Sequence, residues 1–236
     1  MLHQWLVNQA SVYTEGALSL KMRRRRMKVF EEHFEKIFSE ELKNGKKITV
    51  LDIGGCLSFW KTTQFKYFDA VDITIMNLSK EKIPKEDVSH IRSVVGDATN
   101  LQEYRDGEFD FCFSNSVIEH VGGVMEQKKM VQEMRRCGRA GYLQTPNKFF
   151  FMEPHFLFPF FQFLPVKWKV FMLMNFRLGH YAKVKERDEA FETARSIRLV
   201  SKKELRLLFP DIPIFIEKWG PLTKSFYLFY GEKSYM

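Results

Sequence analysis

The chain has few cysteines, no long apolar run and no signal-peptide pattern, and each of these features excludes a class of protein. It has only three cysteines, Cys56, Cys112 and Cys137, with no C-x-x-C pair, so neither a disulfide framework nor a zinc site is expected. Its apolar runs are interrupted well before the roughly 20 residues that span a bilayer. The N-terminus also lacks the basic-then-apolar order of a signal peptide. We therefore expect a cytoplasmic protein, with peripheral contact at a membrane left open.

Nucleotide-binding signatures are scarce too. The phosphate loop G-x-x-x-x-G-K-[ST] is absent, and no Tyr-x-x-x-Lys pair stands in a predicted helix, which disfavours an NAD(P)-dependent or nucleotide-sugar oxidoreductase. No RNA-binding signature or zinc-finger spacing accompanies the net charge of +8, so nucleic acid is the least favoured partner. The Arg23–Arg26 run predicts a solvated helix face, with an anionic membrane surface or an acidic substrate as alternatives.

Residues 1–45 are predicted to form an N-terminal arm followed by an amphipathic helix. Between residues 21 and 43, apolar side chains such as Met27, Phe30 and Phe34 recur at intervals of three and four. Asn44-Gly45 is a typical end for such a helix. Residues 1–20 are weakly patterned, and either a short helix or a mobile arm is consistent with them.

Beyond Gly45 the chain alternates between short apolar strands and helix-sized segments. The strands lack polar alternation, which is typical of a parallel sheet covered by helices on both faces. A doubly wound α/β domain over residues 46–236 is therefore expected. A helix is expected over Val124–Arg136, and Ser201 and Glu204 indicate a capped helix over Ser201–Leu208. The expected strands are 48–53, 67–73, 91–95, 109–114 and 142–145, then 212–218 and 225–230.

Polar or small residues follow the first four strands, at the edge where open α/β sheets bind ligands. The first strand ends in Asp52 and runs into Gly54-Gly55, where the backbone can approach a ligand closely. Asp72, about twenty residues on, has the chemistry to accept hydrogen bonds from the ribose hydroxyls of an adenosine. The other two segments are Gly96-Asp97-Ala98 and Phe109-Asp110-Phe111-Cys112-Phe113-Ser114-Asn115-Ser116-Val117-Ile118-Glu119-His120-Val121.

In this order the four segments resemble the motifs of class I S-adenosylmethionine-dependent methyltransferases, in the branch whose fourth strand reads F-S-N-S-x-x-E-H-V. The resemblance covers about residues 46–147 and continues more loosely to Glu153-Pro154-His155 and Lys224-Ser225. It implies a Rossmann-like sheet of seven strands with the last strand antiparallel, methyl transfer, and S-adenosyl-L-methionine as cofactor. The first motif departs from the family, because Cys56 and Ser58 stand where glycine is usual.

The resemblance also implies a role for each residue that matches a motif. The parts of the cofactor follow the order of the strands, from the methionine moiety to the ribose, the adenine and the sulfonium. Asp52, Gly54 and Gly55 would line the methionine, Asp72 and Ile73 the ribose, and Asp97 and Ala98 the adenine, while Ser114 and Asn115 would form the loop under the sulfonium.

Two histidines are candidate bases. Methyl transfer is an in-line displacement, so the protein aligns the reactants and removes a proton if the acceptor is a hydroxyl. His120 and His155 suit that task because the pKa of histidine lies near working pH. Purely structural roles for both remain alternatives, and Glu119 and Glu153 are candidates to orient them. In the absence of H-E-x-x-H spacing, no metal is expected.

Residues 146–200 interrupt the alternation and are expected to form a cap insertion rich in phenylalanine. The cap has three candidate roles, which do not exclude one another. It could close as a hydrophobic lid over the acceptor, form a pocket for an apolar acceptor, or dip into a membrane interface with the help of Lys167-Trp168-Lys169. A lipid-linked sugar or an isoprenoid acceptor would fit all three. The expected acceptor is therefore a small molecule or one linked to a glycan or lipid.

Two other questions stay open at the level of sequence. A protein that binds the cofactor but is inactive, and regulates a partner through the cap, is an alternative to an enzyme because of Cys56 and Ser58. Subunits could also pair into a homodimer through the helix over residues 21–43 or through the cap.

Overall fold

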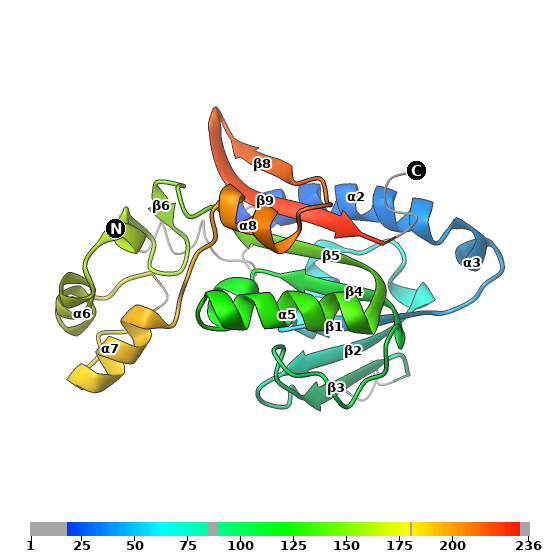
Figure 1. The fold of residues 1–236 in the computed structure, drawn as a ribbon, viewed down its shortest axis with the longest axis horizontal. Helices are drawn as coiled ribbons and strands as arrows, with labels where there is room; N and C mark the ends of the chain where they lie inside the picture. Colours follow the sequence, from blue (N-terminus) through cyan, green and yellow to red (C-terminus); the bar gives the residue numbers. More distant parts are fainter. Residues whose placement is uncertain (1–17, 85–88, 180, 232–236) are drawn as a thin grey trace.

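The computed structural model describes residues 18–84, 89–179 and 181–231. The expected arm over residues 1–20 therefore lies almost wholly outside the described residues. A central sheet of seven strands organises the chain, in the order β3-β2-β1-β4-β5-β9-β8 (Figure 1). The strands are β1 (Ile48–Ile53), β2 (Val71–Asn77), β3 (Ile91–Val95), β4 (Phe109–Asn115), β5 (Gly138–Pro146), β8 (Phe215–Trp219) and β9 (Leu222–Tyr230).

Strand directions confirm the predicted fold class. β1 pairs in parallel with β2 and β4, β2 with β3, and β4 with β5. β9, the last strand of the chain, is antiparallel to both of its neighbours, β5 and β8. This is the doubly wound Rossmann-like sheet that the apolar strands indicated. Because the first five strands are parallel, their carboxyl ends share one edge of the sheet, and the functional residues are expected there.

Helices cover both faces of the sheet and bury one apolar core on each (Figure 1). On one face lie α2 (Leu18–Ile37) and α4 (Leu57–Thr63), and on the other α5 (Val124–Cys137) and α8 (Lys202–Leu208). Phe30 of α2 lies at the centre of the first core. Its ring centroid is 5.2 Å from that of Phe113 and 5.3 Å from that of Tyr142, so this ring joins α2 to β4 and β5.

The predicted bounds of the second strand are wrong. The strand was expected over 67–73, but Phe68–Ala70 form a short 3-10 helix, η1, and β2 runs from Val71 to Asn77. Thr74, Ile75 and Met76 are buried and continue the strand. Strand propensity does not separate the two segments, because aromatic residues such as Tyr67 and Phe68 also favour strands. Pairing with β1 and β3 sets the bounds of β2 instead.

Several boundaries of other elements also differ from the prediction. The single helix expected over 21–43 is interrupted at Phe38, so that α3 (Ser39–Lys43) is separate. β5 is longer than the expected 142–145, and β8 begins three residues after the expected 212. The predicted cap of α8 is confirmed. Glu204 donates its backbone N–H to Ser201 Oγ at 3.2 Å, and Ser201 donates its own to the Glu204 carboxylate at 2.9 Å.

The segment predicted as a cap projects beyond the carboxyl ends of the parallel strands (Figure 1). It leaves and rejoins the sheet domain at one point, where Asn147 and Val200 form a bridge. Its apolar residues form a third core of their own, which includes Phe156, Phe161 and Leu173, instead of joining the two cores on the sheet. Its elements are β6 (Met152–Glu153), β7 (Phe158–Pro159), η4 (Phe161–Phe163), α6 (Val166–Asn175) and α7 (Arg187–Arg195).

Among the helices within the described residues, none is long and apolar enough to cross a membrane.

The position of Phe30 predicts a large effect of its removal. Phe30→Ala should lower the free energy of unfolding by about 3–5 kcal/mol, because it leaves a cavity at the joint between α2 and the sheet. Urea unfolding followed by circular dichroism measures the change. Leu207→Ala is the matched control, since Leu207 is exposed on α8. Equal losses for the two variants would show that α2 is not packed as described.

Candidate active site

The carboxyl ends of β1 to β4 bring four loops together. The turn after β1 is attached to β2, because the backbone N–H of Gly54 donates to the Met76 carbonyl at 2.8 Å. The next loop is attached in the same way, through a 3.0 Å bond from the Gly96 N–H to the Asn77 carbonyl. Asn115 ends β4 at the same edge. The predicted convergence of these segments is thus present in the fold.

The Gly54-Gly55 turn has no room for side chains. Gly54 has a φ of 69°, and a Cβ on it would lie 2.6 Å from the side chain of Val117. A Cβ on Gly55 would overlap the Asp52 carboxylate, at 1.7 Å from Oδ2. Cys56, by contrast, is extended, and Ser58 lies within α4, so neither needs the freedom of glycine. Their side chains are 3.1 Å apart, within hydrogen-bonding distance.

Asp52 lies beneath this turn. It is buried, and Oδ2 accepts a 2.7 Å hydrogen bond from the indole N–H of Trp60 on α4. Its Oδ1 has no hydrogen-bond partner among the described residues. Burial raises the pKa of Asp52 to about 7, against the opposing effect of the Trp60 hydrogen bond. Asp52 therefore supports the turn from below, and its carboxyl group is readily protonated.

The expected place of Asp72 and Ile73 is wrong, as a consequence of the shifted strand. Asp72 is the second residue of β2 and lies opposite Thr49, near the start of β1. Ile73 is buried in the first core. The residue that ends β2 beside the glycine turn is Asn77, whose Nδ2 donates to the Gly55 carbonyl at 2.8 Å. No local signal in the sequence places this end, because it follows from the pairing of β2 with β1 and β3.

The third and fourth loops lie where they were predicted. Asp97 is exposed after β3, and its Oδ1 accepts hydrogen bonds from the N–H and hydroxyl of Thr99 at 2.8 and 2.9 Å. Ala98 is buried next to it. At the end of β4, Ser114 Oγ and Asn115 Oδ1 are buried without a hydrogen-bond partner among the described residues. Such unsatisfied polar atoms are unusual in a folded protein and are typical of a site that a ligand completes.

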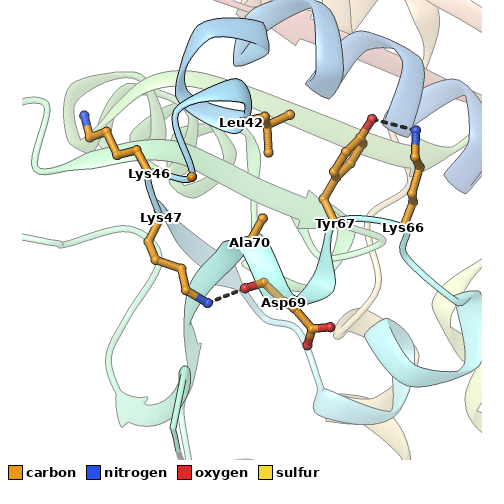
Figure 2. A pocket seen from close by; sticks show the side chains of 8 residues that line it. Leu42, Lys46, Lys47, Lys66, Tyr67, Asp69 and Ala70 are labelled. Carbon is orange, nitrogen blue, oxygen red and sulfur yellow. Dashed lines mark hydrogen bonds between the residues drawn. The ribbon is translucent and has the colours of Figure 1, made fainter.

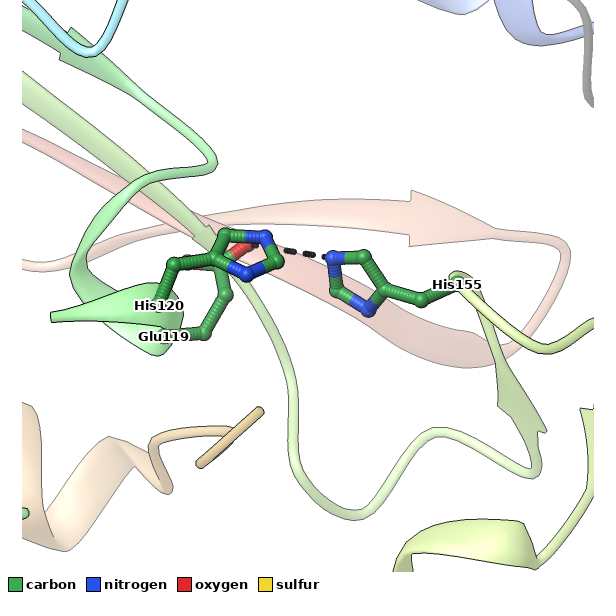
Figure 3. Close-up of side chains that lie close together, drawn as sticks. All are labelled: Glu119, His120 and His155. Atoms are coloured by element: carbon green, nitrogen blue, oxygen red, sulfur yellow. Dashed lines mark ion pairs between the residues drawn. The ribbon is translucent and has the colours of Figure 1, made fainter. Parts of the chain in front are cut away.

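A cluster of histidines and glutamates joins the sheet to the cap (Figure 3). Glu119 and His120 lie in η3 (Ile118–His120) after β4, whereas Glu153 and His155 belong to the cap. The Glu153 carboxylate accepts from the backbone N–H of His155 at 2.8 Å and lies 2.7 Å from its Nδ1. On the other side of the ring, Nε2 is 3.9 Å from Glu119 Oε1.

The fold therefore brings both predicted histidines together, with ring centroids 4.7 Å apart. Glu119 is fully buried, and its Oε2 accepts a 3.0 Å hydrogen bond from Thr145. Its Oε1 has no hydrogen-bond partner among the described residues. His120 is exposed, and Figure 3 shows its ring next to that of His155. Sequence adjacency alone could not establish these contacts, because the two pairs are far apart in the chain.

Burial and neighbouring charges make the groups of the cluster titrate differently. Burial raises the pKa of Glu119 to about 7. Burial of part of the ring, together with the charge of His155, lowers the pKa of His120 to about 4. Burial also opposes the charge of His155, but the hydrogen bond and the charge of Glu153 outweigh it and raise the pKa of His155. At neutral pH His120 is thus uncharged, and His155 is the more basic of the two rings.

The cluster also bears on the expectation of no metal. That expectation rested on spacing in the sequence, but Glu119, His120 and His155 each present a ligand atom, and these atoms lie within 4.8 Å of one another. Two imidazoles and one carboxylate form a donor set that suits transition metals. A test of the site must therefore include the removal of metal ions.

One cavity lies away from these loops. It has a volume of about 300 Å³ and is lined by residues such as Lys46, Lys47 and Asp69, which precede β1 and β2 (Figure 2). It therefore opens at the amino edge of the sheet, opposite the four loops. The amine of Lys47 donates to the Asp69 carbonyl and that of Lys66 to the Tyr67 hydroxyl, so these contacts already occupy the lysines. We do not assign the active site to this cavity.

Comparison with known proteins agrees with this geometry. Residues 51–143 match the family model of the methyltransferase domain. Two solved carbon methyltransferases, CurJ and DszA, are each 11% identical, with TM-scores of 0.56 and 0.54 over 93% of this chain and 56% of theirs. WbdD, in complex with a kinase inhibitor, is 15% identical, with a TM-score of 0.50 over 86% of this chain and 40% of its own.

This chain spans about half the length of these solved structures, and at such identities the likeness concerns the fold. No curated protein matches the chain. The domain match covers residues 51–143 and, on a sheet of this order, supports S-adenosylmethionine-dependent methyl transfer, with S-adenosylmethionine as the cofactor. The loops fit that cofactor. The glycine turn leaves backbone exposed where a Cβ would clash, and the unsatisfied oxygens of Ser114 and Asn115 lie at the same edge.

The buried carboxyl of Glu119 predicts a dependence of stability on pH. Its pKa is raised on folding, so it stabilises the fold at low pH, and this stability is lost as pH rises from about 4.5 to 7. At pH 8, Glu119→Gln should therefore unfold at a higher temperature than the wild type, with a free energy of unfolding that is larger by on the order of 2–3 kcal/mol. At pH 4.5 the two proteins should unfold at similar temperatures. Differential scanning calorimetry measures both.

Glu192→Gln provides the control, because Glu192 is exposed on α7. If Glu119→Gln destabilised the protein equally at both pH values, the buried carboxyl would not be protonated as we describe.

Proposed function

We propose that this methyltransferase methylates a hydroxyl group of a small-molecule, lipid-linked or glycan-linked acceptor, and that His155 removes the proton. The observation that carries the proposal is the position of His155 between two carboxylates, at the junction of the cap with the sheet. Glu153 orients the ring through Nδ1, and Nε2 is directed towards Glu119. This is the arrangement of a base held by an acid, in which the distal nitrogen is left to act.

The loops at the carboxyl edge would hold the cofactor. Gly54 and Gly55 would contact the methionine moiety through backbone groups, supported from below by Asp52. Asp97 and Ala98 would contact the adenine, and Ser114 and Asn115 would lie under the sulfonium. For the ribose we propose Asn77 in place of Asp72 and Ile73, because Asn77 ends β2 beside the glycine turn. When bound, S-adenosylmethionine supplies an electrophilic methyl group.

The residues of the cluster would remove the proton of the acceptor and contact the acceptor. His155 Nε2 would accept the proton of the acceptor hydroxyl, and the charge that forms on the ring would be stabilised by Glu153. His120 is uncharged at neutral pH and exposed, so it is suited to accept or donate a hydrogen bond to the acceptor. Glu119 has an unpartnered oxygen near both rings, and its raised pKa allows it to donate a hydrogen bond while protonated.

The alternative of an inactive, regulatory partner rested on Cys56 and Ser58. Both residues have ordinary backbone conformations. The position with a left-handed φ in this turn, Gly54, is a glycine as in the family's motif. The departure from the family's motif therefore gives little support to loss of cofactor binding. An oxidoreductase is disfavoured by the methyltransferase domain match.

Because β2 ends at Asn77 and not at Ile73, we can predict which variant of this strand weakens cofactor binding. Asn77→Ala should weaken binding of S-adenosylmethionine by roughly tenfold, because it removes a hydrogen bond that holds the glycine turn. Asp72→Ala is the matched control on the same strand and should bind normally. Isothermal titration calorimetry measures both. The reverse pattern, with weak binding only in Asp72→Ala, would overturn our assignment of the ribose site.

The proposed base makes a second prediction. His155→Ala should lower kcat by about 10²- to 10⁴-fold while S-adenosylmethionine still binds, because proton removal is lost. The rate of the wild type should rise with pH through the pKa of His155. Glu153→Gln should lower that pKa and move the rising limb to lower pH. Formation of S-adenosylhomocysteine with a panel of hydroxyl acceptors measures the rates, and the imidazole resonances in NMR report the pKa directly.

Two outcomes would count against a histidine base. His155→Ala could methylate at the wild-type rate, which would exclude the role of His155. Alternatively, a chelator could abolish activity and Zn²⁺ or Mn²⁺ restore it, which would make the cluster a metal site instead.

A further inference from the structure

The outer surface of the cap exposes large aromatic side chains that a water-soluble fold normally buries. Trp168, Phe171 and Phe176 are 61%, 52% and 54% exposed, and they form a chain of ring contacts. Phe149 and Phe163 form a second exposed pair, stacked 6.0 Å apart. We call Trp168, Phe171 and Phe176, which are joined by ring contacts, the aromatic surface. Exposed apolar groups of this kind mark a site of interaction with another molecule or a membrane.

The pattern of α6 shows that this exposure follows from the sequence of the helix. α6 packs on the cap's own core through Val170 and Leu173, which are both buried. Its larger rings, Trp168 and Phe171, are on the opposite side and point away from that core. A surface helix of a soluble protein normally has its polar residues there. α6 and α7 lie farthest from the sheet, so the aromatic surface is not covered by the rest of the described fold (Figure 1).

Basic residues accompany the aromatic surface. Between residues 148 and 185 the basic side chains are Lys148, Lys167, Lys169, Arg177, Lys183 and Lys185. The single acid in that stretch is Glu153, which is buried and bonded to His155, whereas the exposed acids of the cap, Glu186, Asp188, Glu189 and Glu192, lie at or on α7. Over the whole cap, residues 146–200, nine lysines and arginines outnumber five aspartates and glutamates. Lys167 and Arg177 are exposed and flank the rings of α6. The partner of this surface should therefore be apolar at the centre and negatively charged around it.

An anionic lipid bilayer has that combination. Tryptophan and phenylalanine insert at the boundary between headgroups and acyl chains, and lysine and arginine contact the anionic headgroups. Both exposed charged residues next to these rings in the sequence, Lys167 and Arg177, are basic, so a symmetric contact centred on the rings would bring the positive charges of two copies near each other. Charge complementarity thus favours a membrane over a homodimer at this surface.

We propose that the aromatic surface of the cap docks the enzyme on an anionic lipid bilayer. Trp168, Phe171 and Phe176 insert at the interface, and Lys167 and Arg177 contact the headgroups. The proposal does not depend on the base or on the acceptor, because vesicle binding is measured without turnover.

Vesicle sedimentation with the full chain tests the proposal. The wild type should sediment with vesicles of phosphatidylcholine and phosphatidylglycerol, and much less with phosphatidylcholine alone. The double variant Trp168→Glu/Phe171→Glu should lose at least about tenfold in partitioning, because it removes two inserted rings. Lys167→Glu/Arg177→Glu should lose the preference for the anionic vesicles. Leu207→Glu, which changes an exposed leucine on α8, should bind as the wild type does.

Equal thermal unfolding temperatures would show that the variants are folded, which is expected because the altered side chains are exposed. A wild type that stays in the supernatant with both vesicles would overturn the proposal. So would a Trp168→Glu/Phe171→Glu variant that binds as tightly as the wild type. Light scattering after size exclusion tests the other occupant: a dimeric wild type and a monomeric double variant would assign the surface to a second copy of the chain and overturn membrane docking.

Discussion

The parallel pairing of β1 with β2 and β4 is the constraint on which the site depends. Hydrogen bonds between neighbouring strands determine which residues reach the carboxyl edge, and a shift of a few residues exchanges one set for another. Asp52 lies opposite Ile75 and Phe113 in this register. As a result the glycine turn, Asn77 and Asn115 meet at one edge, whereas Asp72 remains near the other. The same pairing buries apolar side chains on both faces, so the edge is held by two cores.

The cap supplies what the sheet lacks. The sheet domain contributes Glu119 and His120 to the cluster, but the more basic ring, His155, and the carboxylate that orients it come from the cap. The bridge between Asn147 and Val200 attaches both ends of the cap at one place. On its outer side the cap presents aromatic and basic residues. One insertion thus carries both a group suited to catalysis and an exposed aromatic surface.

Much of the fold could be predicted from local patterns. The buried strand 48–53, the helix after Gly123 and the capped helix after Ser201 each follow from the spacing of apolar residues or from a capping pair, which act over a few residues. The second strand could not be located in this way. Apolar residues occur along the whole of Tyr67 to Asn77, and the bounds of the strand depend on pairing with β1 and β3, which are distant in the sequence.

The sequence by itself determined the fold class, the glycine turn and the candidate residues His120 and His155, because these depend on residue type and on order along the chain. Only the tertiary structure decided that Asn77 and not Asp72 ends β2, that Glu153 holds His155, and that the fully buried Glu119 faces both rings. It also decided that the phenylalanine-rich segment packs on itself and leaves aromatic rings exposed. These features arise from contacts between distant segments, and the burial and charge at those contacts have no signature in a local pattern.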